Sequence, residues 1–238
     1  MVNKIAIVIP AFNPQQSFIR FVQSLFSLDI EKIIIVNDGS DEKYDSVFKE
    51  LMKFDCCHVI QHDQNYGKGR ALKTAFTYIL TRKENYQGIL TVGAHGQHSL
   101  QDVKLLLTMT KVFSVGIVLG VRNFRSSDST FKMYWGNWVT SLFFEALFRR
   151  KLLDTQTGLR YIAMQELIWL LAVKGERFDY DTNMLVTALK RKCPIFEVEI
   201  GTLRLKKNSI IYYDEIMNAR EIITQMLSNY LKPWKKKR

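Results

Sequence analysis

The stretch "EKIIIVNDGS", residues 31–40, indicates the fold class of this chain. Residues 33–36 are four β-branched apolar residues in a row, which is typical of a strand buried on both faces of a parallel sheet. Asn37 and Asp38 follow the run, and Gly39 permits a sharp turn. Ligands of open α/β sheets bind in the loops at the carboxyl ends of strands, so the stretch predicts a buried strand and one side of a site.

Similar apolar runs recur before and after this stretch, and amphipathic helical patterns separate them. The runs predict further strands at 4–10, 57–62, 88–93 and 115–120, with helices at 15–28, 42–54, 67–82 and 99–111. Strands that alternate with helices across short connections are typical of a doubly wound α/β domain. We therefore expect an α/β fold with a mostly parallel central sheet flanked by helices.

The pattern changes after about residue 121. It predicts a long aromatic-rich helix at 130–150, a polar segment "DTQTGLR" at 154–160, a helix at 180–192 and a strand at 195–201. The last pattern, at 213–231, is an amphipathic helix, and the tail "KPWKKKR" that ends the chain carries five cations. We expect one domain over 1–212, then a C-terminal amphipathic helix and basic tail over 213–238.

Composition narrows the classes of function. The chain has 238 residues and a formal net charge of +11, which favours an anionic partner such as a phosphorylated substrate, a membrane surface or nucleic acid. No recognised nucleic-acid module occurs, so we expect no nucleic acid partner. Three cysteines without a C-x-x-C pair indicate a cytoplasmic setting. No apolar run approaches the ~18 to 20 residues of a membrane span, and no signal peptide is evident.

Three loops hold candidate site residues, and each has two readings. Asp38 is placed to contact a nucleotide base or ribose, or to form an Asx turn or helix N-cap. Lys68, in "QNYGKGRAL", is placed to bind a phosphate at a helix N-terminus, or is a solvated lysine in a glycine-containing loop. In "DTQTGLR", Arg160 is placed to clamp phosphate oxygens, or belongs to a structural turn with a surface ion pair.

The four histidines lie between residues 58 and 98, beside Cys56 and Cys57, which raises the question of a zinc site. Adjacent cysteines rarely ligate one zinc ion together, and the usual paired spacings are absent. His58 and His62 point to the same side of a predicted strand, but they are four residues apart, roughly 13 Å. The sequence therefore argues against zinc.

Several segments, taken in order, resemble the family-two glycosyltransferases of the GT-A fold. They are "IVIPAFNP", "IIIVNDGS", "NYGKGRAL", "TVGAHGQH", "GVRNF", "GNWVTSLFF", "DTQTGLR" and "FDYDTNML…IFEVEI", which together span nearly 200 residues. The branch that they resemble most is that of the polyprenyl-phosphate sugar transferases, including dolichyl-phosphate glucosyl- and mannosyltransferases. The resemblance implies transfer of a sugar, with inversion, from a nucleoside-diphosphate sugar to a polyprenyl phosphate for cell-surface glycan or glycolipid synthesis.

The resemblance also implies roles for particular residues. It places the nucleotide sugar at Pro10, Ala11, Asn13, Asp38, Lys68 and Ala94. It places Arg122 near the phosphates and puts Asp154, Gln156 and Arg160 at the acceptor side as catalytic residues. The basic tail would hold the protein at the inner face of the membrane as a peripheral protein, with an integral-membrane protein as a partner.

One motif departs from the family pattern. The family usually reads Asp-Ala-Asp-Gly-Gln-His where this chain has Gly93, Ala94 and His95 before Gly96, Gln97 and His98. A hard cation such as Mg²⁺ prefers oxygen ligands, so metal binding is expected to be weakened or absent. If a divalent cation binds, His95 and Gln97 are the candidate ligands and Mn²⁺ is favoured. The alternative function is a catalytically silent GT-A domain that acts as a nucleotide- or partner-binding regulatory subunit.

Overall fold

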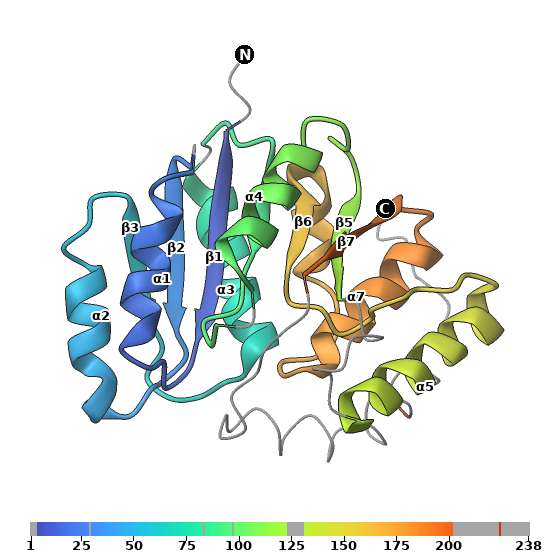
Figure 1. Cartoon of the computed structure of the whole chain (residues 1–238), viewed down its shortest axis with the longest axis horizontal. Coiled ribbons are helices and arrows are strands. Elements are labelled where there is room, and N and C mark those ends of the chain that lie inside the picture. The colour runs from blue at the N-terminus through green and yellow to red at the C-terminus, as the bar shows by residue number, and fades with distance from the viewer. Residues whose placement is uncertain are drawn as a thin grey trace.

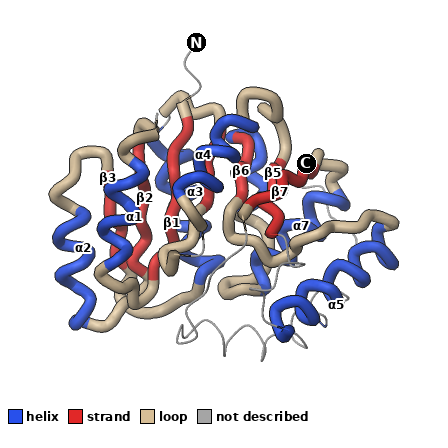
Figure 2. Tube along the Cα trace, in the orientation of Figure 1, coloured by secondary structure: helices blue, strands red, loops and turns tan. Residues whose placement is uncertain are grey.

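The structure is a computed structural model that describes residues 4–28, 30–82, 84–96, 98–122, 131–201 and 224, with the backbone alone for 131–136. Seven strands form one sheet in the order β3-β2-β1-β4-β6-β5-β7 (Figure 2). Strand β6 runs antiparallel to both of its neighbours, and the other described pairs are parallel. The predicted α/β class with a mostly parallel sheet is confirmed.

The first half of the chain alternates strands and helices as its sequence pattern predicts. The strands are β1 (Ile5–Ala11), β2 (Lys32–Asn37), β3 (Cys57–Gln61) and β4 (Gly88–Thr91). The helices are α1 (Ser17–Leu25), α2 (Asp45–Leu51) after a short 3₁₀ turn (Glu42–Tyr44), α3 (Lys68–Arg82) and α4 (Leu100–Met109). Each lies within the range predicted for it or differs by one or two residues at an end.

The second half contains the predicted long helix, helix and strand, together with one strand that the sequence patterns did not reveal. The expected elements are β5 (Ile117–Arg122), α5 (Phe131–Phe148), α7 (Asp179–Lys190) and β7 (Ile195–Ile200). The unexpected strand is β6 (Arg160–Ala163), followed by a 3₁₀ turn (Met164–Glu166) and the short helix α6 (Leu167–Leu170). Because β6 lies between β4 and β5, it joins the two halves of the sheet.

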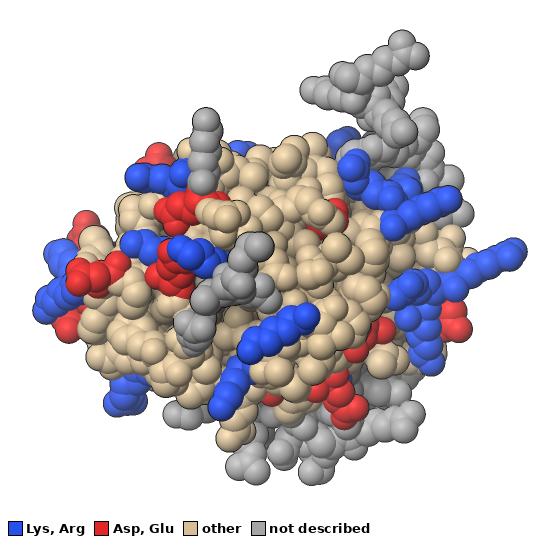
Figure 3. All heavy atoms as spheres, turned by 90° about the horizontal axis from the view of Figure 1, so that it is seen from above, with Lys and Arg blue, Asp and Glu red and all other residues tan. Residues whose placement is uncertain are grey.

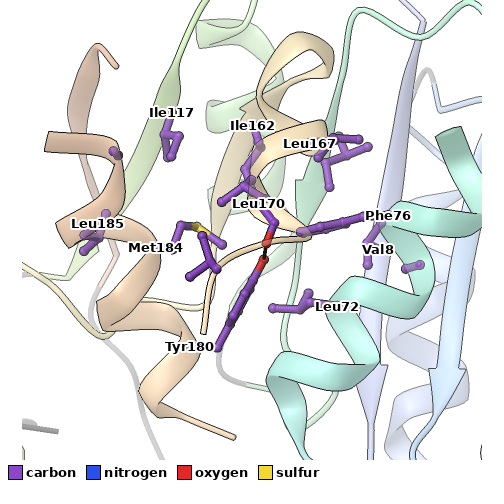
Figure 4. Close-up of a cluster of buried hydrophobic side chains, with 14 of the residues drawn as sticks. Val8, Leu72, Phe76, Ile117, Ile162, Leu167, Leu170, Tyr180, Met184 and Leu185 are labelled. Atoms are coloured by element: carbon purple, nitrogen blue, oxygen red, sulfur yellow. Dashed lines mark hydrogen bonds between the residues drawn. The ribbon is translucent and has the colours of Figure 1, made fainter. Parts of the chain in front are cut away.

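Two apolar layers hold the sheet between its helices (Figure 1). Side chains alternate across a strand, so Ile7 of β1 faces the layer formed with α1, α2 and α4, whereas Val8 faces the layer formed with α3, α6 and α7. Figure 4 shows the second layer, where Phe76 of α3 and Met184 of α7 lie around Tyr180. The buried Tyr180 hydroxyl donates a 2.9 Å hydrogen bond to the Leu170 carbonyl, so this large side chain leaves no unpaired polar group in the core.

The direction of β6 decides where the polar segment 154–160 lies. Strands β1, β2, β4 and β5 run the same way, so their carboxyl ends share one edge of the sheet. Because β6 is antiparallel, its first residue, Arg160, lies at that same edge, opposite Thr91 of β4. The loop that enters β6 is thereby placed beside the loops that leave β1, β2, β4 and β5.

The opposite edge of the sheet, where the parallel strands begin, is a mixed charged surface. Figure 3 shows the end at which the parallel strands begin, where acidic and basic side chains are interspersed around an uncharged centre. No helix within the described ranges is long and apolar enough to cross a membrane. The helix and tail predicted over 213–238 lie outside the described residues, apart from residue 224.

Candidate active site at the carboxyl edge of the sheet

The loops after β1 and β2 are fastened to each other at the carboxyl edge. Asn13 has a φ of 49°, and its side-chain oxygen accepts a 2.9 Å hydrogen bond from the backbone N–H of Asp41. Its own backbone N–H donates to the Ser40 hydroxyl at 2.9 Å, while the backbone of Asp38 donates to the carbonyl of Ala11. Pro10, Ala11, Asn13 and Asp38 therefore lie together at the ends of β1 and β2, and their contact with a nucleotide sugar stays a prediction.

Asp38 links this group to the loop that begins α3. Its carboxylate is 3% exposed and accepts hydrogen bonds from the backbone N–H groups of Tyr66 (3.1 Å) and Gly67 (2.7 Å). The Nδ1 atom of His62 lies 2.7 Å away from the same carboxylate, and Nε2 of that ring lies 2.9 Å from the Thr74 hydroxyl. Asp38 thus fixes the residues just before Lys68, and its contact with a base or ribose stays a prediction.

Lys68 begins α3 and extends toward the second half of the chain. Its ammonium pairs with the carboxylate of Asp181 in α7, and both side chains are largely buried, at 21% and 7% exposed. Gly69, next along α3, packs against Tyr180, where an added β-carbon would lie 2.5 Å from the tyrosine side chain. That close approach of α3 and α7 lets the two charges meet.

Arg122 and Asp154, predicted separately from the sequence, form a buried pair. The Nε and Nη2 atoms of Arg122 donate to the two carboxylate oxygens of Asp154 at 2.5 and 2.9 Å. The backbone N–H groups of Arg122 (3.2 Å) and Gln156 (3.2 Å) donate to the same carboxylate. A bidentate pair of this kind fixes the plane of the guanidinium at the end of β5.

Arg160 is buried in the turn itself, at 1% exposed. Its guanidinium donates to the backbone carbonyls of Thr155 (3.0 Å), Thr157 (2.8 Å) and Asp181 (3.0 Å). The alternative of a surface ion pair for this segment is wrong, because both Asp154 and Arg160 are buried. Arg160 shapes the loop from within, and its contact with an acceptor phosphate stays a prediction.

Helix α5 supports the same loop from outside with residues that the sequence patterns did not single out. The amide oxygen of Asn137 accepts from the Thr155 backbone N–H at 3.0 Å, and its amide nitrogen donates to the Leu153 carbonyl at 2.6 Å. The hydroxyls of Thr140 and Thr155 lie 2.7 Å apart. The aromatic-rich helix thus holds the polar turn at the sheet edge.

His98 lies between these charged pairs, and the sequence patterns assigned it no role. It is 5% exposed, and burial, together with the nearby cations Arg122 and Lys68, lowers its pKa to about 3. The ring is therefore neutral at pH 7, and neither ring nitrogen has a hydrogen-bond partner within the described part of the chain. The signals in the sequence that pointed to it were its position in the loop after β4 and its match to the last residue of the family motif.

The described residues at this edge do not fit a resident metal ion. Gly93 supplies no side-chain ligand, and His95 is exposed. Gln97 lies outside the described residues. Within the ranges that the structure describes, no three His, Cys, Asp or Glu side chains gather closely enough to hold a metal, which also argues against the zinc site weighed above. Ala94 is buried at 4% exposed, in the same loop.

The predicted residues thus form two connected groups. One, at the ends of β1 and β2, contains Pro10, Ala11, Asn13 and Asp38; the other contains Lys68, Arg122, Asp154, Gln156 and Arg160. The hydrogen bonds from Tyr66 and Gly67 to Asp38 connect them. The residues that sequence reasoning missed are His98 and Asp181, with Asn137 and Thr140 as supports.

Comparisons with known proteins agree on the family and on the fold. The model of the family described as "Glycosyl transferase family 2" matches residues 6–167. The UDP-N-acetylglucosamine–dolichyl-phosphate N-acetylglucosaminyltransferase of Methanococcus voltae is 27% identical over 222 residues, covering 84% of this chain and 85% of that protein. An uncharacterised protein of Methanocaldococcus jannaschii is 26% identical over 207 residues, covering 84% and 82%.

Solved structures of glucosyl-3-phosphoglycerate synthase from Mycobacterium tuberculosis share the fold. The complex with Mn²⁺, UDP and phosphoglyceric acid superposes with a TM-score of 0.73 at 16% identity, covering 98% of this chain and 80% of that one. The complex of that enzyme with Mg²⁺ and UDP gives a TM-score of 0.70 at 16% identity, covering 98% and 81%. The fold is the GT-A fold.

Proposed function

The chain belongs to glycosyl transferase family 2, and we propose that it transfers a sugar, with inversion, from a nucleoside diphosphate to a polyprenyl phosphate. The observation that carries the proposal is the set of buried cations at the carboxyl edge of the sheet. Lys68 and Arg122 are held there by Asp181 and Asp154, beside the loop 154–160. Both substrates carry phosphates, and fixed cations in a site of low exposure stabilise such groups strongly.

The proposed reaction needs little acid–base chemistry from the protein. A phosphoryl oxygen of the acceptor attacks the anomeric carbon, the bond from that carbon to the diphosphate oxygen breaks, and the electron pair leaves with the diphosphate. Phosphate monoesters have a second pKa of about 6, so the acceptor is already ionised at pH 7. The protein's part is to orient the two substrates and to stabilise the negative charge that gathers on the leaving group.

The two groups of site residues divide this work. Pro10, Ala11, Asn13, Asp38 and Ala94 line the nucleotide, and Lys68 lies where its diphosphate would follow. Arg122 contacts phosphate, with Asp154 holding its guanidinium in place, and Gln156 lies next to that pair on the acceptor side. The guanidinium of Arg160 donates hydrogen bonds to three backbone carbonyls, so Arg160 acts by fixing the conformation of the turn.

No step of the proposed reaction runs through a metal ion, because the described donors do not fit one. Mn²⁺, which the structural neighbour binds together with UDP, stays our preferred cation if one is used, with His95 and Gln97 as its candidate ligands. The relative from Methanococcus voltae, a dolichyl-phosphate transferase by its name, supports the choice of a polyprenyl phosphate acceptor and of UDP-N-acetylglucosamine as the first donor to test.

We further propose that the protein works at the inner face of the membrane as a peripheral protein. The basic tail "KPWKKKR" supports this, because each cation near an anionic surface contributes about 1 kcal/mol of attraction. An acceptor embedded in the membrane also makes an integral-membrane protein a natural partner.

A second candidate function is favoured by one observation, the replacement of both motif aspartates by Gly93 and His95. In that case the domain binds a nucleotide or a partner protein and regulates another enzyme without transferring sugar itself. Transfer of label separates the two candidates.

The experiment offers UDP-N-acetylglucosamine, UDP-glucose and GDP-mannose, each labelled in the sugar, to the full chain with a polyprenyl phosphate in detergent. Labelled lipid is measured with Mn²⁺, with Mg²⁺ and with EDTA. The proposal predicts lipid-linked label from at least one donor, and that label should be lost in Arg122→Met. Tight binding of a nucleotide without any lipid-linked label would favour the silent domain.

A further inference from the structure

The unpartnered side chain of His98 is the least explained polar group of the site. It is buried beside two cations, and within the described residues neither Nδ1 nor Nε2 has a hydrogen-bond partner. Buried polar atoms of native proteins are nearly always hydrogen-bonded, so an exception calls for an explanation such as a bound ligand.

Gly158 faces the His98 ring without a side chain of its own. Leaving out its two neighbours in the chain, a β-carbon built on this glycine would have two described atoms within 4 Å. They are Nε2 of His98 at 3.5 Å and Nζ of Lys68 at 3.6 Å. The Thr91 hydroxyl donates to the Gly158 carbonyl at 2.9 Å and fixes the backbone there. The backbone of Gly158 thus faces two nitrogens able to donate hydrogen bonds, with no side chain between, and an added β-carbon would come into van der Waals contact with both.

Two cations lie near this point, and each is already paired with a carboxylate, Lys68 with Asp181 and Arg122 with Asp154. The remaining N–H groups of the Lys68 ammonium can still donate to a ligand oxygen. Lys68 and Arg122 both lie close enough to His98 to lower its pKa. Asp102 is the acidic group on the other side, and its carboxylate already accepts hydrogen bonds from Ser99 and from the Gly201 backbone N–H. Lys68 keeps 21% of its side-chain exposure, so we expect a ligand to enter on its side.

We infer that Lys68, His98 and Gly158 form a binding position for a phosphoryl oxygen, with Nε2–H of His98 and Nζ of Lys68 as donors and Gly158 leaving the room. This inference rests on the proposed function, which makes phosphoryl groups the ligands. When the sugar–oxygen bond breaks, an oxygen at this position would carry part of the new charge on the diphosphate, and two preorganised donors would stabilise it. In this chain the two donors would stabilise the charge on the leaving diphosphate. Where the motif aspartates are present, a metal ion bound to their carboxylates would stabilise that charge.

Calorimetry with the full chain in EDTA tests this inference with three probes: UDP, inorganic pyrophosphate and a short-chain polyprenyl monophosphate. His98→Phe removes the donor and keeps the ring volume, His98→Gln keeps a donor near Nε2, and Gly158→Ala fills the space. Gly158 has no left-handed φ, so an alanine there causes no backbone strain. His58→Phe is the matched control, because His58 of β3 stacks on Tyr78 of α3, and the strands β2 and β1 separate β3 from β4 in the sheet. Uridine is the ligand control.

We expect His98→Phe and Gly158→Ala to weaken the binding of UDP and pyrophosphate about tenfold or more, because the first loses a hydrogen-bond donor to a charged group and the second places a methyl group between the two donors and the ligand. His98→Gln should retain most of the affinity, and uridine should bind all variants alike. Loss for UDP and pyrophosphate is the result that the inference predicts, and loss for the polyprenyl phosphate alone would contradict the assignment of the position to the diphosphate.

Equal affinity of His98→Phe, Gly158→Ala and the parent for every probe would overturn the inference and leave the proposed function standing. A loss of affinity in His98→Gln that is as large as the loss in His98→Phe would also overturn the inference. Dependence on His98 without any sugar transfer would support the phosphoryl position and count against the proposed function. A parent chain that binds none of the phosphorylated probes would overturn both.

Discussion

The ammonium of Lys68 at the start of α3 pairs with the carboxylate of Asp181 in α7, 113 residues further along the chain. Asp181 also lies 3.4 Å from the guanidinium of Arg160. One carboxylate therefore holds two cations at the junction between the two halves of the sheet.

This arrangement predicts unequal effects of removing the two partners. Asp181→Asn leaves two cations without their carboxylate and should lower the free energy of unfolding by about 2–4 kcal/mol, whereas Lys68→Met leaves Asp181 with Arg160 and should cost about 1 kcal/mol. Urea unfolding of both single variants and the double variant measures this. If the losses in the free energy of unfolding of the two single variants add up to the loss in the double variant, the pair is not coupled.

The Arg122–Asp154 pair predicts a loss of stability of similar size. Asp154→Asn removes the negative charge of a buried bidentate pair and replaces one of its two acceptor oxygens with an NH₂ donor, so we expect the free energy of unfolding to fall by about 3 kcal/mol. Glu31→Gln is the matched control, because its partner Lys4 is half exposed and such pairs contribute about 0–1 kcal/mol. Equal effects of the two substitutions would contradict the role given to Asp154.

Asp102 predicts a dependence of stability on pH. Burial alone would raise the pKa of its carboxyl, but hydrogen bonds from the Gly201 backbone and from Ser99 outweigh burial and lower it. A carboxyl whose pKa is depressed on folding stabilises the folded state above its unfolded pKa, and that contribution is lost as the pH falls through the folded value. Asp102→Asn should therefore destabilise the protein by about 1–2 kcal/mol at pH 7.

The difference between parent and Asp102→Asn should shrink below the usual carboxyl pKa of 3.8. Glu50→Gln, which alters an exposed pair with Lys53, should show no such trend. Unfolding curves at a series of pH values measure both variants. A difference that stays constant down to acid pH would mean that Asp102 acts through packing and not through its charge.

The motif loop predicts a gain of metal dependence. Gly93→Asp combined with His95→Asp restores two oxygen ligands, so Mg²⁺ should tighten UDP binding in the double variant about tenfold or more and have little effect on the parent. If Mn²⁺ affects the parent at all, it should do so more than Mg²⁺. Calorimetry with each ion and with EDTA distinguishes these cases. Strong Mg²⁺ dependence of the parent would contradict our reading of the loop.

Much of the fold follows from local patterns. The β-branched runs around 33–36 and their neighbours predict buried parallel strands, and the loops after them hold the group of Asn13 and Asp38 at the expected edge. The strand β6 was missed because four residues, "RYIA", are too few to show a period. Its antiparallel direction, which brings the loop 154–160 into the site, depends on partners far away in the sequence.

The sequence patterns also could not predict which charged residues pair with one another. We predicted substrate contacts for four charged residues: Lys68, Arg122, Asp154 and Arg160. In the structure, Asp154 pairs with Arg122, and Arg160 donates hydrogen bonds to backbone carbonyls of the site. His98 showed no spacing that marks a catalytic or metal site, and its lack of partners became visible when α3, β4 and the loop 154–160 met. Contacts between distant segments decide which polar residues remain available to a ligand.

The most direct test of the account is a crystal structure of the full chain with UDP, grown in EDTA. We predict that a phosphoryl oxygen of the nucleotide lies within about 3.2 Å of Nζ of Lys68 and of Nε2 of His98, against Gly158, with the nucleoside at the ends of β1 and β2. UDP bound elsewhere, or bound in this place with its phosphates turned away from Lys68 and His98, would contradict the account.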